Sequence, residues 1–399
     1  MNVDLTVDLA KLRLPNPIIV ASGPPSMSPD RILKSFKYGA GGVVSKTIGF
    51  DPVMQLQPKP RMYVTNSKDA LAGKQYSFYS IDLMSEYPPE KWVRFFKKVR
   101  EDMKQNRLDG ILVASIAGRD YEEWERLAKI VEGAGVDAVE TNLSCPHVEK
   151  GKLMGRATAG DPAVVKNIIK TVRGACAVPV ICKITPHGAN PVELAKTMVS
   201  AGANALVSTA RFQGLVMDPD GMRPILWGGY GGYGGPWQVP ISLSWTAHIA
   251  ASGLGVPIIG SGGISSGDDM LKFIMVGADA VQICTAVMIL GYEIIPRMKE
   301  RLEQWMGSKH FARIRKFRGR SLGKIIALED LPRNKVYRIG VNGEKCTSCG
   351  VCVRACPYDA ISLDQGKKAI VDDRKCDNCG LCVSICPFDA MKLEKKNSS

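Results

Sequence analysis

The sequence lacks any uninterrupted apolar run of about 18 residues, so we predict that no segment crosses a membrane. Its first residues, MNVDLTVDLAKLRL, lack the basic start, apolar core and small-residue cleavage site of a signal peptide. We therefore expect a cytoplasmic protein. Free thiols and metal thiolates persist in that reducing compartment, whereas disulfides are rare there.

Two further signatures are missing. No G-x-G-x-x-G follows a strand and opens a helix, so we predict no dinucleotide-binding domain, and the run GGYGGYGG (228–235) is interpreted as part of a loop. No base-reading module is present, and the aromatic residues are not interleaved with basic ones for stacking on bases. We therefore expect no nucleic-acid partner.

The formal net charge is +14, which is compatible with phosphate ligands and with acidic protein partners. The positive charge is densest in KHFARIRKFRGRSLGK (309–324), which contains no acidic residue. That stretch is either a solvated linker face or a docking face for an acidic protein.

Eight of the twelve cysteines lie in two C-terminal runs, CTSCGVCVRACP and CDNCGLCVSICP, which share the pattern C-x2-C-x2-C-x3-C-P. In this pattern three cysteines of one run bind a [4Fe–4S] cluster, and the fourth ligand comes from the other run. We assign one cluster to Cys346, Cys349, Cys352 and Cys386, and a second to Cys376, Cys379, Cys382 and Cys356. Two zinc sites are the alternative, but zinc usually takes paired C-x2-C knuckles without a fourth cysteine followed by proline.

Residues before these runs alternate short apolar segments with amphipathic segments of helical length, which indicates parallel β/α architecture. The expected strands are 17–24, 41–47, 111–116, 137–144, 179–185, 205–210, 257–263 and 280–286. Eight such units predict an α/β fold of the (β/α)8 TIM barrel type, with a doubly wound sheet as the alternative. We predict a barrel over 1–306, a basic linker over 307–340 and a ferredoxin-like domain with two [4Fe–4S] clusters over 341–399.

The expected strands end in polar residues at the face where barrel enzymes place their active sites. These residues are Ser22, Lys46, Ser115, Asn142, Lys183, Thr209, Ser261 and Thr285. Two lysines directed into one barrel mouth are unfavourable unless an anion lies there. Gly262 and Gly263, which follow the seventh strand, predict a phosphate site where backbone N–H groups can approach oxygen atoms.

The motifs SKTI, NLSCPH, KITP and SGGI, together with the paired cysteine runs, resemble the class 1 dihydroorotate dehydrogenase and dihydropyrimidine dehydrogenase family. Within that family the similarity is to an FMN-bearing barrel followed by a C-terminal ferredoxin domain. The resemblance covers nearly the whole chain. It implies FMN at the barrel mouth, two [4Fe–4S] clusters and a homodimer.

The resemblance also implies roles for single residues. Lys183 matches the lysine beside the N1/O2 edge of the flavin, where its charge stabilises the anionic reduced ring. Lys46 and Lys183 are the implied catalytic lysines. The implied cofactor contacts are Ala21, Ser22, Lys46, Thr47, Asn142, Lys183, Thr209, Gly262, Gly263, Cys284 and Thr285.

Cys145 matches the family's acid/base residue. Reduction of a C=C bond needs a hydride on one carbon and a proton on the other, and a thiol with a pKa of about 8.5 can supply the proton. The segment EKGKLMGRATAG (149–160) is the expected mobile lid beside it. The alternative for Cys145 is a small buried thiol, which is what we expect of Cys176 and Cys182.

The match fails at the positions that read the substrate. The family holds a uracil-like ring with several asparagines and a threonine, whereas Ser80, Ala210 and Arg211 stand at three of those places and Asn142 remains. Such changes alter substrate choice, so we hypothesise a substrate other than uracil or thymine. Arg211 can pair with a carboxylate or phosphate, or it can face solvent or a local aspartate. The expected substrate contacts are Ser80, Asn142 and Arg211.

A loop rich in glycine, tryptophan and tyrosine, LWGGYGGYGGPWQVP (226–240), is either a lid with stacking surfaces, a dimer contact or a connector. Gln238 within it stands where the family has a glycine near the flavin.

The function we predict is that of an FMN- and iron–sulfur-dependent oxidoreductase subunit that reduces or forms a C=C bond in a cyclic small molecule, which can be an anion. Electrons pass through the clusters, and a separate NAD(P)H-oxidising flavoprotein subunit or a ferredoxin exchanges them. One alternative is an electron-transfer adaptor with a non-catalytic barrel. The other is dihydroorotate or dihydropyrimidine dehydrogenase itself.

Overall fold

The structure is a computed structural model that describes residues 3–143, 160–186, 190–227, 229–333 and 337–395. The chain divides into two compact units, Met1–Ile325 and Ile326–Ser399. Each unit is described by itself. Within the described ranges, no helix is both long and apolar enough to cross a membrane.

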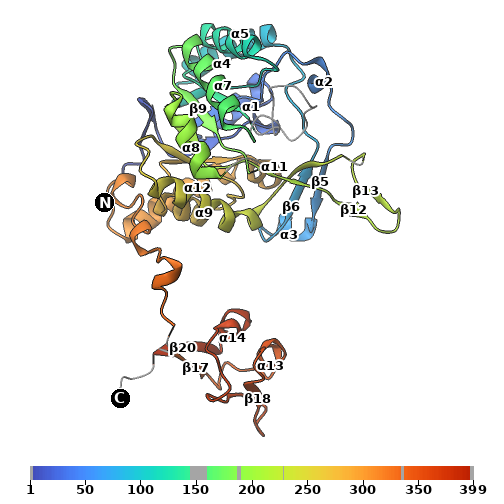
Figure 1. Cartoon of the computed structure of the whole chain (residues 1–399), viewed down its shortest axis with the longest axis vertical. Coiled ribbons are helices and arrows are strands. Elements are labelled where there is room, and N and C mark those ends of the chain that lie inside the picture. Colours follow the sequence, from blue (N-terminus) through green and yellow to red (C-terminus); the bar gives the residue numbers. More distant parts are fainter. Residues whose placement is uncertain (1–2, 144–159, 187–189, 228, 334–336, 396–399) are drawn as a thin grey trace. The chain divides into compact units, whose positions relative to one another are not determined.

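The first unit is a closed barrel of eight parallel strands, and all eight are the strands predicted from the sequence (Figure 1). The TIM-barrel prediction is therefore confirmed, and the doubly wound alternative is wrong. The barrel strands are β3 (Ile18–Val20), β4 (Gly42–Val44), β7 (Ile111–Ile116), β8 (Ala138–Asn142), β9 (Val180–Lys183), β10 (Ala205–Val207), β15 (Ile258–Ser261) and β16 (Ala280–Ile283).

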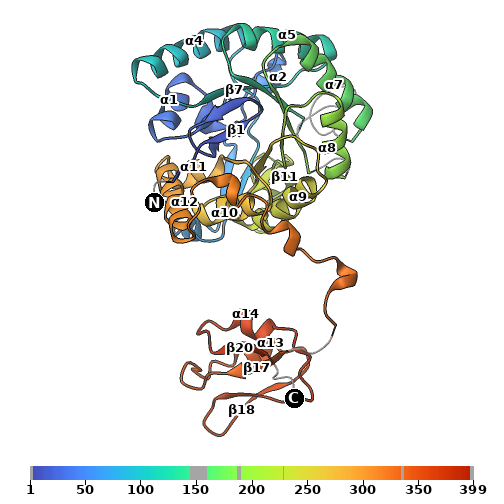
Figure 2. The ribbon, with the colours of Figure 1, turned by 90° about the vertical axis from the view of Figure 1, so that its left-hand side faces the viewer.

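Helices surround the barrel, and their sequences explain where they begin and which face they bury (Figure 2). Asp161 caps one helix by accepting hydrogen bonds from the amides of Ala163 and Val164, and a proline follows the cap. The barrel helices are α1 (Pro29–Lys37), α4 (Pro89–Gln105), α5 (Tyr121–Gly133), α7 (Pro162–Ala175), α8 (Pro191–Ser200), α9 (Val239–Ala251), α10 (Gly267–Met275), α11 (Thr285–Leu290) and α12 (Ile294–Ser308).

The core lies between the strands and these helices. Along α4, Trp92, Phe96, Val99 and Met103 recur every three or four residues, and all four are buried. An N-terminal hairpin of β1 (Val7–Leu9) and β2 (Leu12–Leu14) adds buried leucines to the same core. The rigid barrel thus fixes where the strand ends lie.

Two excursions of the chain build a small antiparallel sheet. After β4 come α2 (Pro52–Gln55), β5 (Met62–Thr65), α3 (Ser67–Leu71) and β6 (Ser77–Ser80), and after β10 come β11 (Phe212–Gly214) and β14 (Gly231–Gly234). Their order is β11-β14-β6-β5, with Gly232 opposite Ser80.

A hairpin of β12 (Met217–Asp218) and β13 (Arg223–Pro224) extends from the barrel beyond this sheet (Figure 1). The glycine-rich loop predicted over 226–240 thus contains β14, the 3-10 turn η2 (Pro236–Gln238) and the first residues of α9.

Part of the basic stretch 309–324 packs on the barrel. Ile314, in the turn η3 (Ile314–Lys316), and Phe317 are buried in the barrel core, and Arg318 forms an ion pair of 2.7 Å with Asp279. Arg320 lies over the ring of Phe311. The first compact unit therefore extends to residue 325, within the segment 307–340 that the sequence suggests as a linker.

The short turn η4 (Leu322–Lys324) lies at the end of the first unit, and the short turn η5 (Leu328–Asp330) lies near the start of the second. The second unit repeats one motif. Its elements are β17 (Tyr337–Val341), α13 (Val351–Ala355), β18 (Ile361–Leu363), β19 (Ala369–Val371), α14 (Leu381–Ile385) and β20 (Met391–Lys395). Gly350 and Gly380 precede the two short helices with positive φ angles of 69° and 80°, a conformation that glycine adopts without strain.

Candidate functional site

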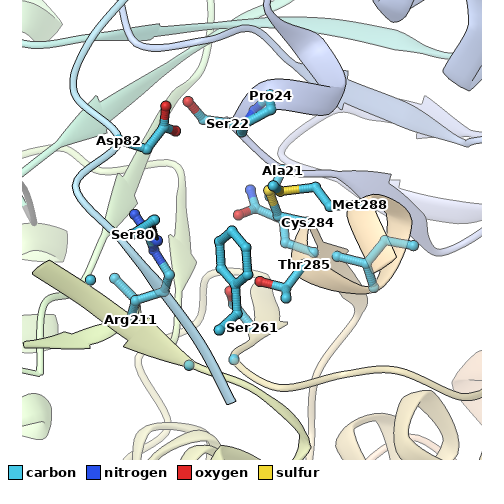
Figure 3. A pocket seen from close by; sticks show the side chains of 18 of the residues that line it. Ala21, Ser22, Pro24, Ser80, Asp82, Arg211, Ser261, Cys284, Thr285 and Met288 are labelled. Carbon is cyan, nitrogen blue, oxygen red and sulfur yellow. Dashed lines mark hydrogen bonds between the residues drawn. The ribbon is translucent and has the colours of Figure 1, made fainter. Parts of the chain in front are cut away.

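A cavity lies at the carboxyl ends of the barrel strands, and most of the predicted site residues line it (Figure 3). The volume of this cavity is about 160 Å³. Of the predicted residues, those that line the cavity are Ala21, Ser22, Lys46, Thr47, Ser80, Asn142, Lys183, Arg211, Gly262, Gly263, Cys284 and Thr285. Thr209 is buried but is not part of the lining, and Cys145 lies outside the described residues.

Lys46 forms a buried ion pair with Asp82, a residue that the sequence analysis did not identify. Arg61 reaches the same carboxylate at 3.4 Å. Burial opposes ionisation of Asp82, but its contacts with Lys46 and the charges of Arg211 and Arg61 outweigh burial and lower its pKa. The only signal for Asp82 in the sequence is a carboxylate two residues after Ser80.

Lys183 is held by a second buried group. Its ammonium donates to Gln282 at 2.6 Å and lies 3.4 Å from the carboxylate of Glu140, and Gln282 also donates to Glu140. Glu140 is fully buried, and the sequence analysis missed both it and Gln282 because they lie within strands. Each cavity lysine therefore has a carboxylate partner from the protein, so the lysines alone do not require a bound anion.

Hydroxyl and amide groups connect the first four strand ends. Thr47 Oγ1 lies 3.2 Å from Ser22 Oγ and 3.0 Å from Ser115 Oγ, and it accepts a hydrogen bond of 2.9 Å from Asn142. This network fixes Thr47 and Asn142 against the barrel core. Both residues also line the cavity.

The ends of β15 and β16 suit a phosphate-bearing cofactor. Gly262 and Gly263 have φ angles of +101° and +81°, which side-chain-bearing residues rarely adopt. A Cβ at Gly262 would lie 2.4 Å from Gln238 Nε2, so the backbone at this position leaves no room for a side chain. Cys284 and Thr285 continue the same wall, and burial raises the pKa of the Cys284 thiol.

The residues that are present fit FMN. Gly262 and Gly263 adopt backbone conformations that residues with a side chain rarely adopt. They line the same cavity as lysine, threonine and asparagine side chains that can donate hydrogen bonds. Gln238, which also lines the cavity, donates to the carbonyl of Ala210 at 2.9 Å, and its own carboxamide oxygen is buried with no partner among the residues described.

Arg211 lies on the wall built by the small antiparallel sheet. Its Nη1 donates to Ser80 Oγ at 2.5 Å, so two of the positions where the family pattern fails contact each other. Arg211 therefore does not simply face solvent, and within the described ranges it forms no ion pair with an aspartate.

In the second unit, each predicted cysteine set surrounds its own small cavity. Cys346, Cys349, Cys352 and Cys386 line one cavity, and Cys356, Cys376, Cys379 and Cys382 line the other. Each fourth cysteine therefore comes from the opposite run. Over the described ranges, no three cysteine, histidine or carboxylate side chains converge closely enough to ligate a single ion. Four cysteines around one cavity suit the ligation of a multi-atom cluster.

Comparisons with known sequences agree with both units. The family described as dihydroorotate dehydrogenase matches residues 4–306, and that described as 4Fe-4S dicluster domain matches 345–390. The chain is 28% identical over 363 residues to the NAD-dependent dihydropyrimidine dehydrogenase subunit PreA of Escherichia coli (strain K12). The aligned region covers 89% of this chain and 86% of the relative.

Two further relatives extend the comparison. The chloroplastic dihydropyrimidine dehydrogenase (NADP(+)) of Arabidopsis thaliana is 30% identical over 83% of this chain and 80% of its own length. The catalytic subunit of dihydroorotate dehydrogenase B (NAD(+)) of Pyrococcus furiosus is 32% identical over 79% of this chain and 98% of its own length.

Proposed function

The chain belongs to the dihydroorotate dehydrogenase family and carries a 4Fe–4S dicluster domain, and from this premise we propose that it is the catalytic subunit of an FMN- and iron–sulfur-dependent dehydrogenase. It is an oxidoreductase that acts on CH–CH groups. The proposed reaction reduces, or in the reverse direction forms, a C=C bond in a cyclic small molecule. The observation that carries the proposal is a single cavity at the barrel mouth lined by twelve of the predicted contact residues.

Bound FMN would supply hydride transfer to a substrate carbon. The residues that would hold it are Lys46, Thr47, Asn142 and Lys183 around the ring, and Gly262, Gly263 and Thr285 around the phosphate. Lys183 presents a positive charge to the cavity from a fixed position, because Gln282 and Glu140 orient its ammonium. Lys46 is fixed in the same way by Asp82.

A proton donor is needed beside the second carbon. Cys145 remains the residue predicted for this role, and it lies outside the described residues. Its thiol would deliver a proton to the carbon while the hydride arrives at the other carbon, which is general acid catalysis.

We assign the two [4Fe–4S] clusters to the two cysteine sets, and electrons would enter or leave the chain through them. The E. coli relative is named as a subunit of an NAD-dependent enzyme. By analogy, a separate NAD(P)H-oxidising flavoprotein subunit would exchange electrons with this chain, or a ferredoxin would replace it. A cytoplasmic homodimer completes the proposal.

Anaerobic purification with FMN, iron and sulfide tests the function. The chemically reduced chain should be reoxidised by an unsaturated cyclic compound, seen as return of the flavin absorbance. Cys145→Ser should keep the flavin and cluster spectra while slowing this reoxidation about 10²- to 10⁴-fold. If no unsaturated ring compound in a broad panel reoxidised the chain, the adaptor alternative would replace this proposal.

A further inference from the structure

The cations of the cavity differ in how they are neutralised. Lys46 is paired with Asp82, and Lys183 is paired with Glu140. Among the residues that the structure describes, the charged side chains that line the cavity are these four and Arg211, which adds one further positive charge. Over the described parts of the chain, the hydrogen-bond partner of Arg211 is the neutral hydroxyl of Ser80. The cavity wall therefore carries one positive charge more than its carboxylates balance.

The position of Arg211 is built by the surrounding sheet. A Cβ at Gly232 would lie 2.5 Å from the central carbon of the guanidinium and 2.8 Å from both terminal nitrogens. The guanidinium therefore lies flat against β14, at a place where any residue other than glycine would displace it. Ser80, opposite Gly232 across the β6–β14 pair, is fully buried and fixes one edge of the guanidinium. The glycine at position 232 is thus explained by the arginine that packs on it.

A guanidinium has five N–H donors in a planar fork, and one bond to a hydroxyl leaves others to pair with an oxyanion. The charge of Arg211 acts on Asp82, but that carboxylate is already paired with Lys46 and Arg61. A partly buried cation whose hydrogen-bond partner is a neutral hydroxyl is further stabilised by a carboxylate in bidentate contact. The FMN phosphate is another oxyanion, but the two glycines expected to hold it follow Ser261 at the end of β15, whereas Arg211 precedes β11 of the small antiparallel sheet; Figure 3 labels Ser261 and Arg211.

We propose that Arg211 binds a carboxylate of the substrate, so that the chain acts on an unsaturated ring acid and discriminates against neutral rings of the same shape. The inference rests on the proposed function, because it places the ring of the substrate beside a flavin in this cavity. Ser80 and Gly232 are positioning residues for the guanidinium. Ser80 stands where the family pattern has an asparagine, a side-chain amide that would bind a neutral pyrimidine.

Matched pairs of probes test the proposal. Calorimetry measures binding of orotate against orotamide, and of benzoate against benzamide, to the FMN-saturated chain, since the members of each pair differ only by a carboxylate in place of a carboxamide. We expect at least one carboxylate to bind about tenfold or more tightly than its amide, as charge-assisted hydrogen bonds predict. Arg211→Gln should abolish that preference, and Arg211→Lys should retain part of it because a charge remains without the fork.

Two variants control for indirect effects. Gly232→Ala keeps the charge of Arg211 but adds a Cβ where the guanidinium lies, so it should also reduce the preference for the carboxylate. Arg223→Gln removes one positive charge from the exposed hairpin strand β13, outside the cavity lining, and should leave the preference unchanged.

The outcomes separate this inference from the proposed function. A carboxylate preference that is absent in the wild type, survives in Arg211→Gln, or disappears equally in Arg223→Gln would overturn the inference. Weakened FMN binding in Arg211→Gln with an unchanged carboxylate preference would assign Arg211 to the phosphate instead. Failure of the wild type to bind flavin would refute the proposed function, and calorimetry on the flavin-free chain would then test Arg211 separately.

Discussion

The ammonium of Lys183 in β9 donates a hydrogen bond of 2.6 Å to the side-chain oxygen of Gln282 in β16, a strand that is not a neighbour of β9 in the barrel. Gln282 in turn donates to Glu140, and Glu140 lies 3.4 Å from Lys183. The positive charge of Lys183 at the cavity is therefore balanced by Glu140, and the amide of Gln282 orients both groups.

This pair predicts opposite shifts of the flavin reduction potential in two variants. Lys183→Gln removes a positive charge that favours added electrons, so the two-electron midpoint potential should fall by about 30–60 mV, as the loss of one charge-assisted hydrogen bond suggests. Glu140→Gln removes a negative charge and should raise the midpoint potential of the flavin. Spectroelectrochemical titration measures both, and shifts of the same sign would contradict the assigned roles.

Asp82 should stabilise the fold in a pH-dependent way. Asp82→Asn leaves Lys46 buried without its carboxylate, so the free energy of unfolding at pH 7 should fall by about 3–5 kcal/mol. The pKa of Asp82 is lowered from its ordinary value of 3.8, so this stabilisation is present above that value and is lost as the pH falls through the lower folded-state pKa.

Urea unfolding measured by tryptophan fluorescence tests this, because Trp92 and Trp124 are fully buried in the barrel. The difference between wild type and Asp82→Asn should shrink as the pH is lowered below 3.8. The control Asp220→Asn, an exposed residue of the hairpin loop, should change the free energy of unfolding by less than about 0.5 kcal/mol at any pH.

Double variants test how the cysteines are shared between clusters. Cys346→Ser with Cys386→Ser removes two ligands of one proposed set, so about half of the iron and acid-labile sulfide should remain, as expected when one of two clusters is lost. Cys346→Ser with Cys356→Ser takes one ligand from each set and should remove both clusters. Cys176→Ser, a buried thiol outside both sets, should leave the iron content unchanged. The reverse order of iron loss would show that each run binds its own cluster.

Gly262 should be required for FMN binding. An alanine there would need a φ near +101° and would place its Cβ 2.4 Å from Ser242 Oγ. We expect Gly262→Ala to weaken FMN binding at least about tenfold, which corresponds to a strain of about 1.4 kcal/mol or more. Fluorescence titration of the flavin-free protein measures this. Gly174→Ala in α7, where the added Cβ meets nothing within 4 Å, should leave FMN affinity unaltered.

Much of the barrel could be predicted from the sequence because its signals are local. Each buried strand is a short apolar run, and residues such as Asp161 and Pro162 mark where the next helix begins. The polar residues at the strand ends follow from the same reasoning, since the carboxyl ends of parallel strands meet at one face. The cysteine runs were equally informative because cluster ligation depends on their spacing.

The remaining features depend on contacts between distant segments. Asp82 and Glu140 look like ordinary carboxylates in the sequence, and only the closed barrel brings them to the two lysines. From the sequence, the glycines of β14 suggested a lid or a connector, because a run of glycines does not indicate which strands it would pair with. Their partners in β6 and β11, and the packing of Arg211 on Gly232, come from tertiary structure.

The strand pair β6–β14 joins stretches that are about 150 positions apart in the chain, as Tyr79 and Gly229 illustrate by their own hydrogen bond. Neither stretch belongs to the cylinder of parallel strands. A substitution in only one of the two stretches would either leave the Ser80 hydroxyl without the guanidinium of Arg211 or displace that guanidinium by steric overlap. New ring preferences in this scaffold should therefore arise from coupled replacements in two remote insertions, with the cylinder beneath left as it was.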